Sequence, residues 1–75
     1  MNSQNQPLSD LRVLDVGCGA GILSEGLGRL GMKSVMGIDP TPKCIELAQA
    51  HLDTQSELSG KVQYKNVSLE NLIEQ

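Results

Sequence analysis

One short segment near the N-terminus constrains the fold more than any other part of the chain. Residues 13–21 read Val-Leu-Asp-Val-Gly-Cys-Gly-Ala-Gly, an apolar run followed by three alternating glycines: Gly17, Gly19 and Gly21. β-branched residues favour a strand, while glycine permits a sharp turn, close approach to a ligand and tight packing against the next helix. The segment therefore predicts a buried strand, a ligand-binding turn and a helix in direct succession.

Two more strands are expected along the chain. The first strand is expected over residues 11–16, and a second over residues 34–38, just before Asp39 and Pro40. Proline has no backbone N–H, so the second strand cannot continue past it. Apolar residues mark a third strand: Val62, Tyr64 and Val67.

Two helices are expected between these strands, because apolar residues recur there with helical periodicity. The first helix is expected over about residues 21–30, where leucines recur on one face and Gly31 is placed to end it: Leu23, Leu27 and Leu30. The second helix is expected to begin with Thr41 as its cap and Pro42 in its first turn. Its apolar face is expected to hold Ile45, Ala48 and Leu52. Residues 53–60 have the polar composition of a loop, and residues 68–72 look like the first turn of a further helix.

The alternation of strands and helices predicts an α/β fold with a parallel sheet. Right-handed crossovers give the strand order 3-2-1 and place both helices on one face. The other face then stays bare, and the glycine-bearing strand lies at an edge where a fourth strand would normally pair. We therefore expect half of a domain over residues 11–75, preceded by a polar tail over residues 1–10.

Composition narrows the classes of function. The chain of 75 residues has no Trp or Phe and a single Tyr, so aliphatic side chains must supply the small core. A net charge of −3 with six scattered basic residues argues against nucleic acid as a partner. No apolar run is long enough to span a bilayer. The two cysteines are not spaced as metal ligands, so we expect free thiols and no zinc site.

Three kinds of ligand can be compared at the glycine turn. An ATP site of the Walker type needs a lysine and a hydroxyl residue after the last glycine, where this chain has Ile22 and Leu23. A dinucleotide site fits Gly17 and Gly19 but requires a third Gly or Ala where Ile22 stands. Asp15 would repel a pyrophosphate and attract a cation. S-adenosylmethionine, with its sulfonium and ammonium groups, is such a ligand.

A second acidic residue follows the next strand. Asp39 comes about 20 residues after the glycines, where its carboxylate oxygens can accept hydrogen bonds from both ribose hydroxyls. The pattern D-x-G-x-G-x-G followed by this acid resembles motif I and the acidic loop of class I S-adenosylmethionine-dependent methyltransferases. The sequence thus favours S-adenosylmethionine over a dinucleotide.

The resemblance extends over roughly residues 11–72 and narrows to one branch. Four segments together look like the ubiquinone-biosynthesis O-methyltransferases: Leu-Asp-Val-Gly-Cys-Gly at 14–19, Leu-Gly-Arg-Leu-Gly at 27–31, Gly-Ile-Asp-Pro at 37–40 and Ser-Leu-Glu at 68–70. The resemblance implies a partial Rossmann-like methyltransferase fold and methyl transfer to a phenolic hydroxyl on a polyprenylated ring. It also implies a mitochondrial location, at the matrix side of the inner membrane.

The resemblance also implies which residues bind the cofactor. Asp15 would orient the methionine ammonium group, the glycine backbone would pass under the methionine and ribose, and Asp39 would hold the ribose. Ile38 or Pro40 would pack against the adenine. The complete expected set is Asp15, Gly17, Cys18, Gly19, Gly21, Asp39, Pro40, Ser68 and Leu69.

Some of these residues have simpler interpretations. Ser68 and Leu69 lie where relatives contact the adenine edge, but Ser68 is better explained as a helix cap. Cys18 is better explained as a small space filler than as a nucleophile, because no basic residue adjoins it. His51 is expected to be solvated near the end of the second helix, without a catalytic role.

No residue of this chain is assigned to the acceptor or to catalysis. The family's substrate-binding and acid/base residues would come after residue 75, so we predict that the polypeptide alone transfers no methyl group. Two alternatives stay open. One is an oxidoreductase fragment that binds NAD, and the other is a non-enzymatic interaction module from a truncated transcript. Such a module would pair or self-associate through its bare sheet face.

Overall fold

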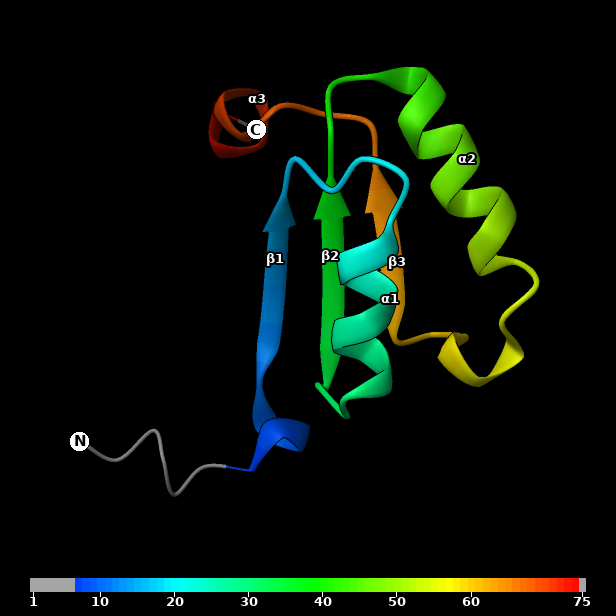
Figure 1. Ribbon diagram of the computed structural model, residues 1–75. Helices are drawn as coiled ribbons and strands as arrows, with labels where there is room; N and C mark the ends of the chain where they lie inside the picture. The colour runs from blue at the N-terminus through cyan, green and yellow to red at the C-terminus, as the bar shows by residue number, and fades with distance from the viewer. Residues whose placement is uncertain (1–6, 75) are drawn as a thin grey trace.

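A computed structural model describes residues 7–74, which form a three-stranded parallel sheet with helices packed on it (Figure 1). The strands are β1 (Arg12–Val16), β2 (Ser34–Ile38) and β3 (Val62–Lys65). The helices are α1 (Ile22–Arg29), α2 (Pro42–Leu52) and α3 (Leu69–Glu74), with short 3-10 helices η2 (Leu8–Asp10) and η3 (Ser56–Leu58). The spatial order β1-β2-β3 confirms the predicted α/β class and the 3-2-1 topology.

The register of the strands decides which side chains share a face. One row across the sheet holds Asp15, Gly37 and Tyr64. The next row on the same face holds Val13, Val35 and Val62. Side chains alternate along a strand, so these two rows face the helices while the residues between them face away.

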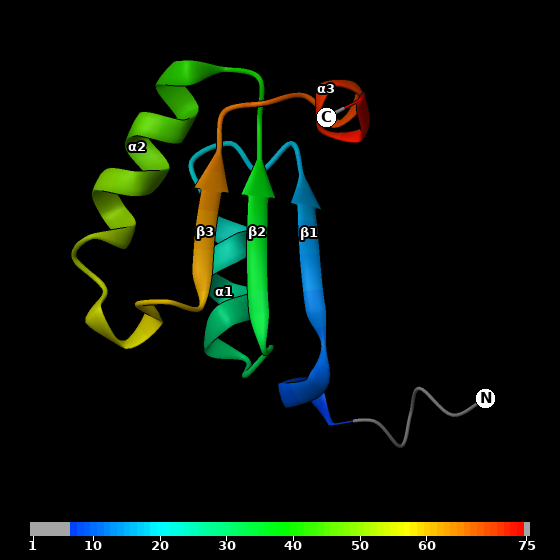
Figure 2. The same ribbon diagram turned by 180° about the vertical axis from the view of Figure 1, so that it is seen from behind.

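Both crossover helices lie on that one face, as predicted. α1 packs over β2 and β3, and α2 contacts β3 (Figure 1). Seen from behind, the three strands are uncovered by either helix (Figure 2). On this open face Leu14 is 45% exposed and Val16 is 51% exposed. The apolar surface expected on the bare side of the sheet is therefore present at β1, whereas Ile38, in the same row as Val16, is buried.

The hydrophobic core lies between the sheet and the two helices. It is built from five buried residues: Met32, Val35, Leu52, Leu58 and Val62. Leu58 is only 1% exposed and comes from η3, inside the segment 53–60 that we expected to be a polar loop. The segment is otherwise polar, which is why the sequence did not predict that the Leu58 side chain packs in the core.

The buried face of α1 differs from the predicted leucine stripe. Leu23 and Leu30 are 61% and 64% exposed, and Leu27 packs against the core only in part. The sheet side of the helix holds Ser24, Glu25 and Gly28. A Cβ at Gly28 would lie 2.8 Å from Cγ2 of Val62, so a small residue is needed for the helix to approach this closely.

Two further expectations concern the end of the third strand and the N-terminal polar tail. β3 stops at Lys65, so Val67 is not part of the strand. Instead, the Val67 backbone N–H donates to the carbonyl oxygen of Asp39 at 3.1 Å, and its side chain is buried. Of the predicted polar tail, residues 8–10 form the exposed helix η2, and residues 1–6 lie outside the described residues.

Candidate functional site

The turns that follow the three strands meet at one edge of the sheet. In a parallel sheet the carboxyl ends of all strands share an edge, and ligands of such folds bind there. The turn from β1 to α1 spans residues 17–21, β2 is followed by Asp39, and β3 by residues 66–68. All three lie at the top of Figure 1. The structure thus brings the predicted site residues of separate segments to the same edge.

The turn after β1 depends on its three glycines. Gly17, Gly19 and Gly21 have φ values of 72°, 56° and 90°, a region that residues with a Cβ rarely adopt. The turn is fixed to the next strand, because the backbone N–H groups of Gly17 and Cys18 donate to the carbonyl oxygen of Ile38 at 2.8 and 3.0 Å. The glycines therefore form a defined loop held against β2.

The surroundings of the glycines differ along this loop. A Cβ at Gly17 or at Gly19 would meet no atom within 4 Å, whereas a Cβ at Gly21 would lie 2.8 Å from Cζ of Tyr64. The first two glycines therefore border open space, and the third packs against β3. This division fits a loop that lets a ligand approach its backbone and then packs tightly where the helix begins.

Asp39 connects the glycine loop with the start of α2. Its Oδ2 accepts a hydrogen bond from the Gly19 backbone N–H at 3.0 Å, and its Oδ1 accepts one from the Thr41 backbone N–H at 2.9 Å. The N–H groups of Thr41 and Gly19 and the Thr41 hydroxyl lower the pKa of the Asp39 carboxyl. The group is therefore a stable anion beside the loop. Thr41 occupies the predicted cap position, but its side chain makes no hydrogen bond that caps the helix.

Asp15 lies beneath α1 rather than at the open surface. It is 9% exposed, and its Oδ2 accepts a hydrogen bond from Oγ of Ser24 at 2.6 Å. Within residues 7–74, its other oxygen, Oδ1, accepts no hydrogen bond. No buried side-chain nitrogen or oxygen in this part of the chain lacks a partner, so Oδ1 reaches solvent. Asp15 therefore has one oxygen without a hydrogen-bond partner among residues 7–74.

Cys18 is buried inside the glycine loop. Burial raises the pKa of its thiol, and the charges of Asp15 and Asp39 raise it further. The neutral thiol is a poor nucleophile. This environment supports the interpretation of Cys18 as a space filler.

The turn after β3 places Ser68 and Leu69 at the start of α3. Oγ of Ser68 accepts a hydrogen bond from the Asn71 backbone N–H at 3.1 Å, which confirms the predicted helix cap. Leu69 is half-buried and Pro40 is exposed at the same edge. Ile38, the alternative adenine contact, is 0% exposed and is therefore closed to a ligand. The adenine contacts of Pro40, Ser68 and Leu69 stay predictions.

Two side chains that were not expected at the site pack against it from the helix side. Ser24 holds Asp15, and the hydroxyl of Tyr64 donates to the Gly21 carbonyl oxygen at 3.3 Å. Burial raises the pKa of Tyr64 to about 12, with a further contribution from Glu25. One sequence signal could have located the contact of α1 with the sheet. Small residues recur at spacings of three and four, which places them on one face of the helix: Gly21, Ser24 and Gly28.

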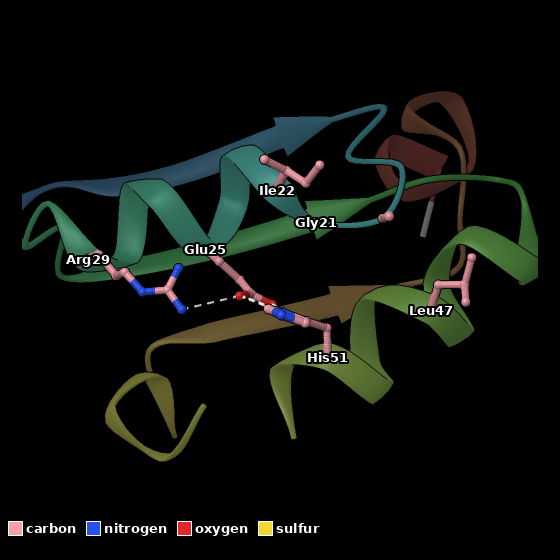
Figure 3. A pocket seen from close by; sticks show the side chains of 7 residues that line it. Gly21, Ile22, Glu25, Arg29, Leu47 and His51 are labelled. Carbon is pink, nitrogen blue, oxygen red and sulfur yellow. Dashed lines mark hydrogen bonds and ion pairs between the residues drawn. The ribbon is translucent and has the colours of Figure 1, made fainter. Parts of the chain in front are cut away.

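A separate cavity of about 290 Å³ lies between α1 and α2 (Figure 3). Ile22 and Leu47 supply apolar walls, and the carboxylate of Glu25 lies beside His51. Neither Asp15 nor Asp39 lines this cavity. Ala20 and Gly21, at the end of the glycine loop, also line the cavity, so it adjoins the loop on the side of the helices.

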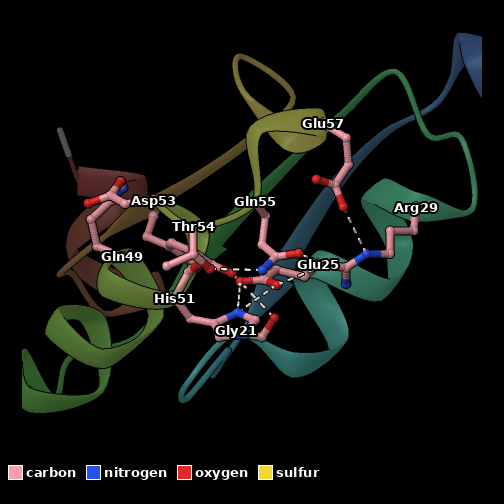
Figure 4. Close-up of polar contacts among 10 residues, drawn as sticks. Gly21, Glu25, Arg29, Gln49, His51, Asp53, Thr54, Gln55 and Glu57 are labelled. Carbon is pink, nitrogen blue, oxygen red and sulfur yellow. Dashed lines mark hydrogen bonds and ion pairs between the residues drawn. The ribbon is translucent and has the colours of Figure 1, made fainter.

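Polar contacts beside the cavity join the helix layer together (Figure 4). Glu25 is 2% exposed, and both of its carboxylate oxygens lie 2.9 Å from Nδ1 of His51. Arg29 lies 3.5 Å from Glu25 and donates to the Gln55 side chain at 2.6 Å. Although its side chain is 61% exposed, His51 is therefore a contact between α1 and α2 and not simply a solvated residue.

Residues 7–74 contain no group of three or more potential metal-ligating side chains. In the same part of the chain, no helix is both long and apolar enough to cross a membrane. Among the described residues, the sheet edge presents two carboxylates, backbone amides and open glycines.

Comparison with known sequences identifies relatives of this chain. It is 49% identical over 70 residues to the mitochondrial ubiquinone biosynthesis O-methyltransferase of Mus musculus, covering 93% of this chain and 19% of that protein. It is 46% identical over 67 residues to the ubiquinone biosynthesis O-methyltransferase of Azorhizobium caulinodans, covering 89% of this chain and 25% of that one. The chain thus spans about a fifth to a quarter of the length of these relatives.

Solved structures show the same fold. The bifunctional kinase-methyltransferase WbdD superimposes with a TM-score of 0.79 and 25% identity, over 97% of this chain and 15% of that one. An S-adenosylmethionine-dependent methyltransferase from Agrobacterium tumefaciens gives a TM-score of 0.72 over 85% of this chain and 20% of that one. At 19% identity, this second likeness shows the fold alone.

One protein family matches most of the sequence. The family described as "Methyltransferase domain" matches residues 13–75, which include the glycine loop, both aspartates and all three strands except Arg12. This match confirms the resemblance drawn from the glycine loop and the second acidic residue. The chain belongs to the methyltransferase-domain family.

Proposed function

We propose that the carboxyl edge of the sheet binds S-adenosylmethionine, and that this chain is the cofactor-binding part of an O-methyltransferase. One observation carries the proposal: two carboxylates, Asp15 and Asp39, flank a loop whose glycines Gly17 and Gly19 border open space. Membership of the methyltransferase-domain family supports it, since that family implies this cofactor. Carboxylates also suit a ligand that carries a sulfonium and an ammonium group better than they suit a pyrophosphate.

In this proposal Asp39 holds the ribose. A carboxylate offers about four lone-pair positions. Two of them accept the backbone N–H groups of Gly19 and Thr41, and the ribose hydroxyls would share the remaining positions with the nearby Thr41 hydroxyl. The same hydrogen bonds fix the carboxylate relative to the loop before a ligand arrives, which reduces the ordering that binding requires.

The remaining contacts follow from the arrangement of the loop. Oδ1 of Asp15 would accept a hydrogen bond from the ammonium group, and the backbone at Gly17 and Gly19 would pass beneath the ligand. Gly21 and Cys18 shape the loop without touching the reacting atoms. Pro40, Ser68 and Leu69 lie where the adenine would be held, in keeping with their place at the same edge.

Bound S-adenosylmethionine supplies an activated methyl group for an in-line displacement. This chain's residues would bind and orient the donor, while the acceptor hydroxyl would need a base or a metal to ionise it. Residues 7–74 contain no group of three or more metal-ligating side chains, and we assign no base to the acceptor. We therefore expect the 75-residue polypeptide to bind the cofactor without turnover, and methyl transfer to a catechol-type quinone precursor by this polypeptide would contradict that.

The acceptor and compartment are proposed from the relatives. Those from Mus musculus, Homo sapiens and Saccharomyces cerevisiae carry both "ubiquinone biosynthesis" and "mitochondrial" in their names. We infer a polyprenylated phenol as the acceptor of the full protein and the mitochondrion as its location, at the matrix side of the inner membrane. Fractionation of mitochondria with an antibody against this chain tests the location.

We also propose that the chain self-associates through the open face of its sheet. Leu14 and Val16 are half-exposed there, and β1 is an edge strand without a second neighbour in the described sheet. Exposed apolar faces and open strand edges favour pairing between chains. Sedimentation velocity tests this, because a stable monomer at all concentrations would count against it.

Isothermal titration separates S-adenosylmethionine from the NAD alternative. We expect the 75-residue chain to bind S-adenosylmethionine and to show no preference for NAD, because Asp15 would lie close to the pyrophosphate. Asp39→Asn should weaken binding at least tenfold, since the ribose loses a charged acceptor. Glu46→Gln, an exposed change on α2, should leave binding unchanged. Tighter binding of NAD would overturn the proposal.

A further inference from the structure

The contact between Ser24 and Asp15 is the most enclosed side-chain hydrogen bond of the site. Ser24 is 0% exposed, and its Oγ donates to Oδ2 of Asp15 at 2.6 Å. This distance is typical of a hydroxyl donating to a carboxylate, one of the stronger kinds of hydrogen bond. The contact joins the first turn of α1 to the strand that ends in the glycine loop.

The sheet leaves space for this serine at one position. Gly37 lies between Asp15 and Tyr64 in the same row, and a Cβ on Gly37 would lie 2.8 Å from the Ser24 Oγ. Any larger residue at Gly37 would displace Ser24 or Tyr64. The central strand is therefore shaped around the serine hydroxyl, which is not expected of a residue that merely fills space.

The hydrogen bond makes the two oxygens of Asp15 unequal. Oδ2 is occupied by Ser24, whereas Oδ1 has no partner within residues 7–74 and reaches solvent. A carboxylate with one oxygen fixed cannot rotate freely about its last bond. Oδ1 of Asp15 therefore points in one fixed direction.

We propose that Ser24 is a positioning residue for the cofactor, which fixes Oδ2 of Asp15 so that Oδ1 meets the ammonium group of S-adenosylmethionine. This inference rests on the proposed function and adds a residue that touches no ligand. Ser24 acts on the amino-acid end of the ligand alone, because the ribose is held by Asp39. Its loss should therefore weaken one half of the ligand's contacts and spare the other.

Two ligands that differ only in the amino-acid end test this role. S-adenosylhomocysteine carries the ammonium group, whereas 5′-methylthioadenosine has the same adenine and ribose and ends at a thioether. Titration calorimetry with the 75-residue chain should show tighter binding of S-adenosylhomocysteine. Ser24→Ala should weaken that binding about tenfold and change the affinity for methylthioadenosine less than twofold.

Matched variants separate positioning from stability. Ser59→Ala removes an exposed serine hydroxyl elsewhere and should change neither affinity. In an Asp15→Asn background, Ser24→Ala should cause no further loss of S-adenosylhomocysteine binding, because both changes act through one contact. Circular dichroism checks that each variant folds, and Ser24→Cys, which keeps nearly the same volume with a weaker donor, replaces Ser24→Ala if that variant unfolds.

Each contrary outcome has a distinct meaning. Equal weakening of both ligands, or loss of the fold in both Ser24 variants, would assign Ser24 to stability and overturn the inference. Equal affinity of the unmodified chain for both ligands would overturn it as well, while cofactor binding itself would stand. If the unmodified chain binds neither ligand, the proposed function fails and the inference fails with it.

Discussion

At the scale of single residues, the three glycines of the loop after β1 have different structural roles. Gly17 and Gly19 are needed for their positive φ and border open space, while Gly21 also packs against the Tyr64 ring. The sequence predicted that all three would form the loop, since alternating glycines are typical of ligand-binding turns. It could not show which one packs, because the neighbour, Tyr64, lies 43 residues further along the chain.

Replacing Gly21 should therefore cost more than replacing a glycine of similar backbone conformation. Gly60→Ala meets only the penalty of a positive φ of 77°, about 1–2 kcal/mol, because a Cβ there meets no atom within 4 Å. Gly21→Ala adds a clash with Tyr64 and should lower the free energy of unfolding by about 2–4 kcal/mol. Urea unfolding measures both. Equal losses would show that Gly21 is not packed as described.

Tyr64 offers a direct optical test of the packing beneath the loop. It is the single tyrosine of a chain without Trp, so absorbance at 295 nm reports its ionisation alone. We expect a midpoint at about 12 in the folded chain and near 10.0 in urea. Because the folded pKa is raised, the contribution of Tyr64 to stability is complete below pH 10.0 and is lost as pH rises towards 12. A midpoint near 10 in the folded chain would contradict this burial.

At the scale of elements, the sequence predicted the strands and both crossover helices because their apolar periods differ. β2 matches the expected residues 34–38, and α2 buries Ala48 and Leu52 as predicted. The orientation of α1 was missed because its sheet side is made of small and polar residues, Ser24, Glu25 and Gly28. In a helix near a ligand edge, the polar side chains that are buried need partners from distant segments, which periodicity does not show.

The contact between α1 and α2 is expected to contribute to stability through His51. His51→Ala leaves the buried Glu25 carboxylate with Arg29 as its nearby cation and should lower the free energy of unfolding by about 1 kcal/mol. In a Glu25→Gln background the same change should cost much less. Glu46→Ala on the same helix serves as an exposed control. An equal loss in both backgrounds would show that His51 stabilises α2 by other means.

At the scale of the whole molecule, two regions compete as the place where a ligand binds. One is the carboxyl edge with the glycine loop, Asp15 and Asp39, and the other is the cavity between α1 and α2. The sequence predicted the first through its motif and gave no sign of the second, which depends on how two helices lie on one face of the sheet (Figure 3). Open glycines and fixed carboxylates favour the edge.

Two-dimensional ¹H–¹⁵N NMR of the chain titrated with S-adenosylhomocysteine would locate the bound ligand. We expect the largest shifts at the backbone amides of Gly17, Gly19 and Asp39, with smaller shifts at Ser68 and Leu69. The amides of Leu47 and His51, on the α2 side of the cavity, should stay close to their original positions. Shifts confined to Ile22, Leu47 and His51, or no shifts at saturating ligand, would contradict the claim that the glycine edge binds S-adenosylmethionine.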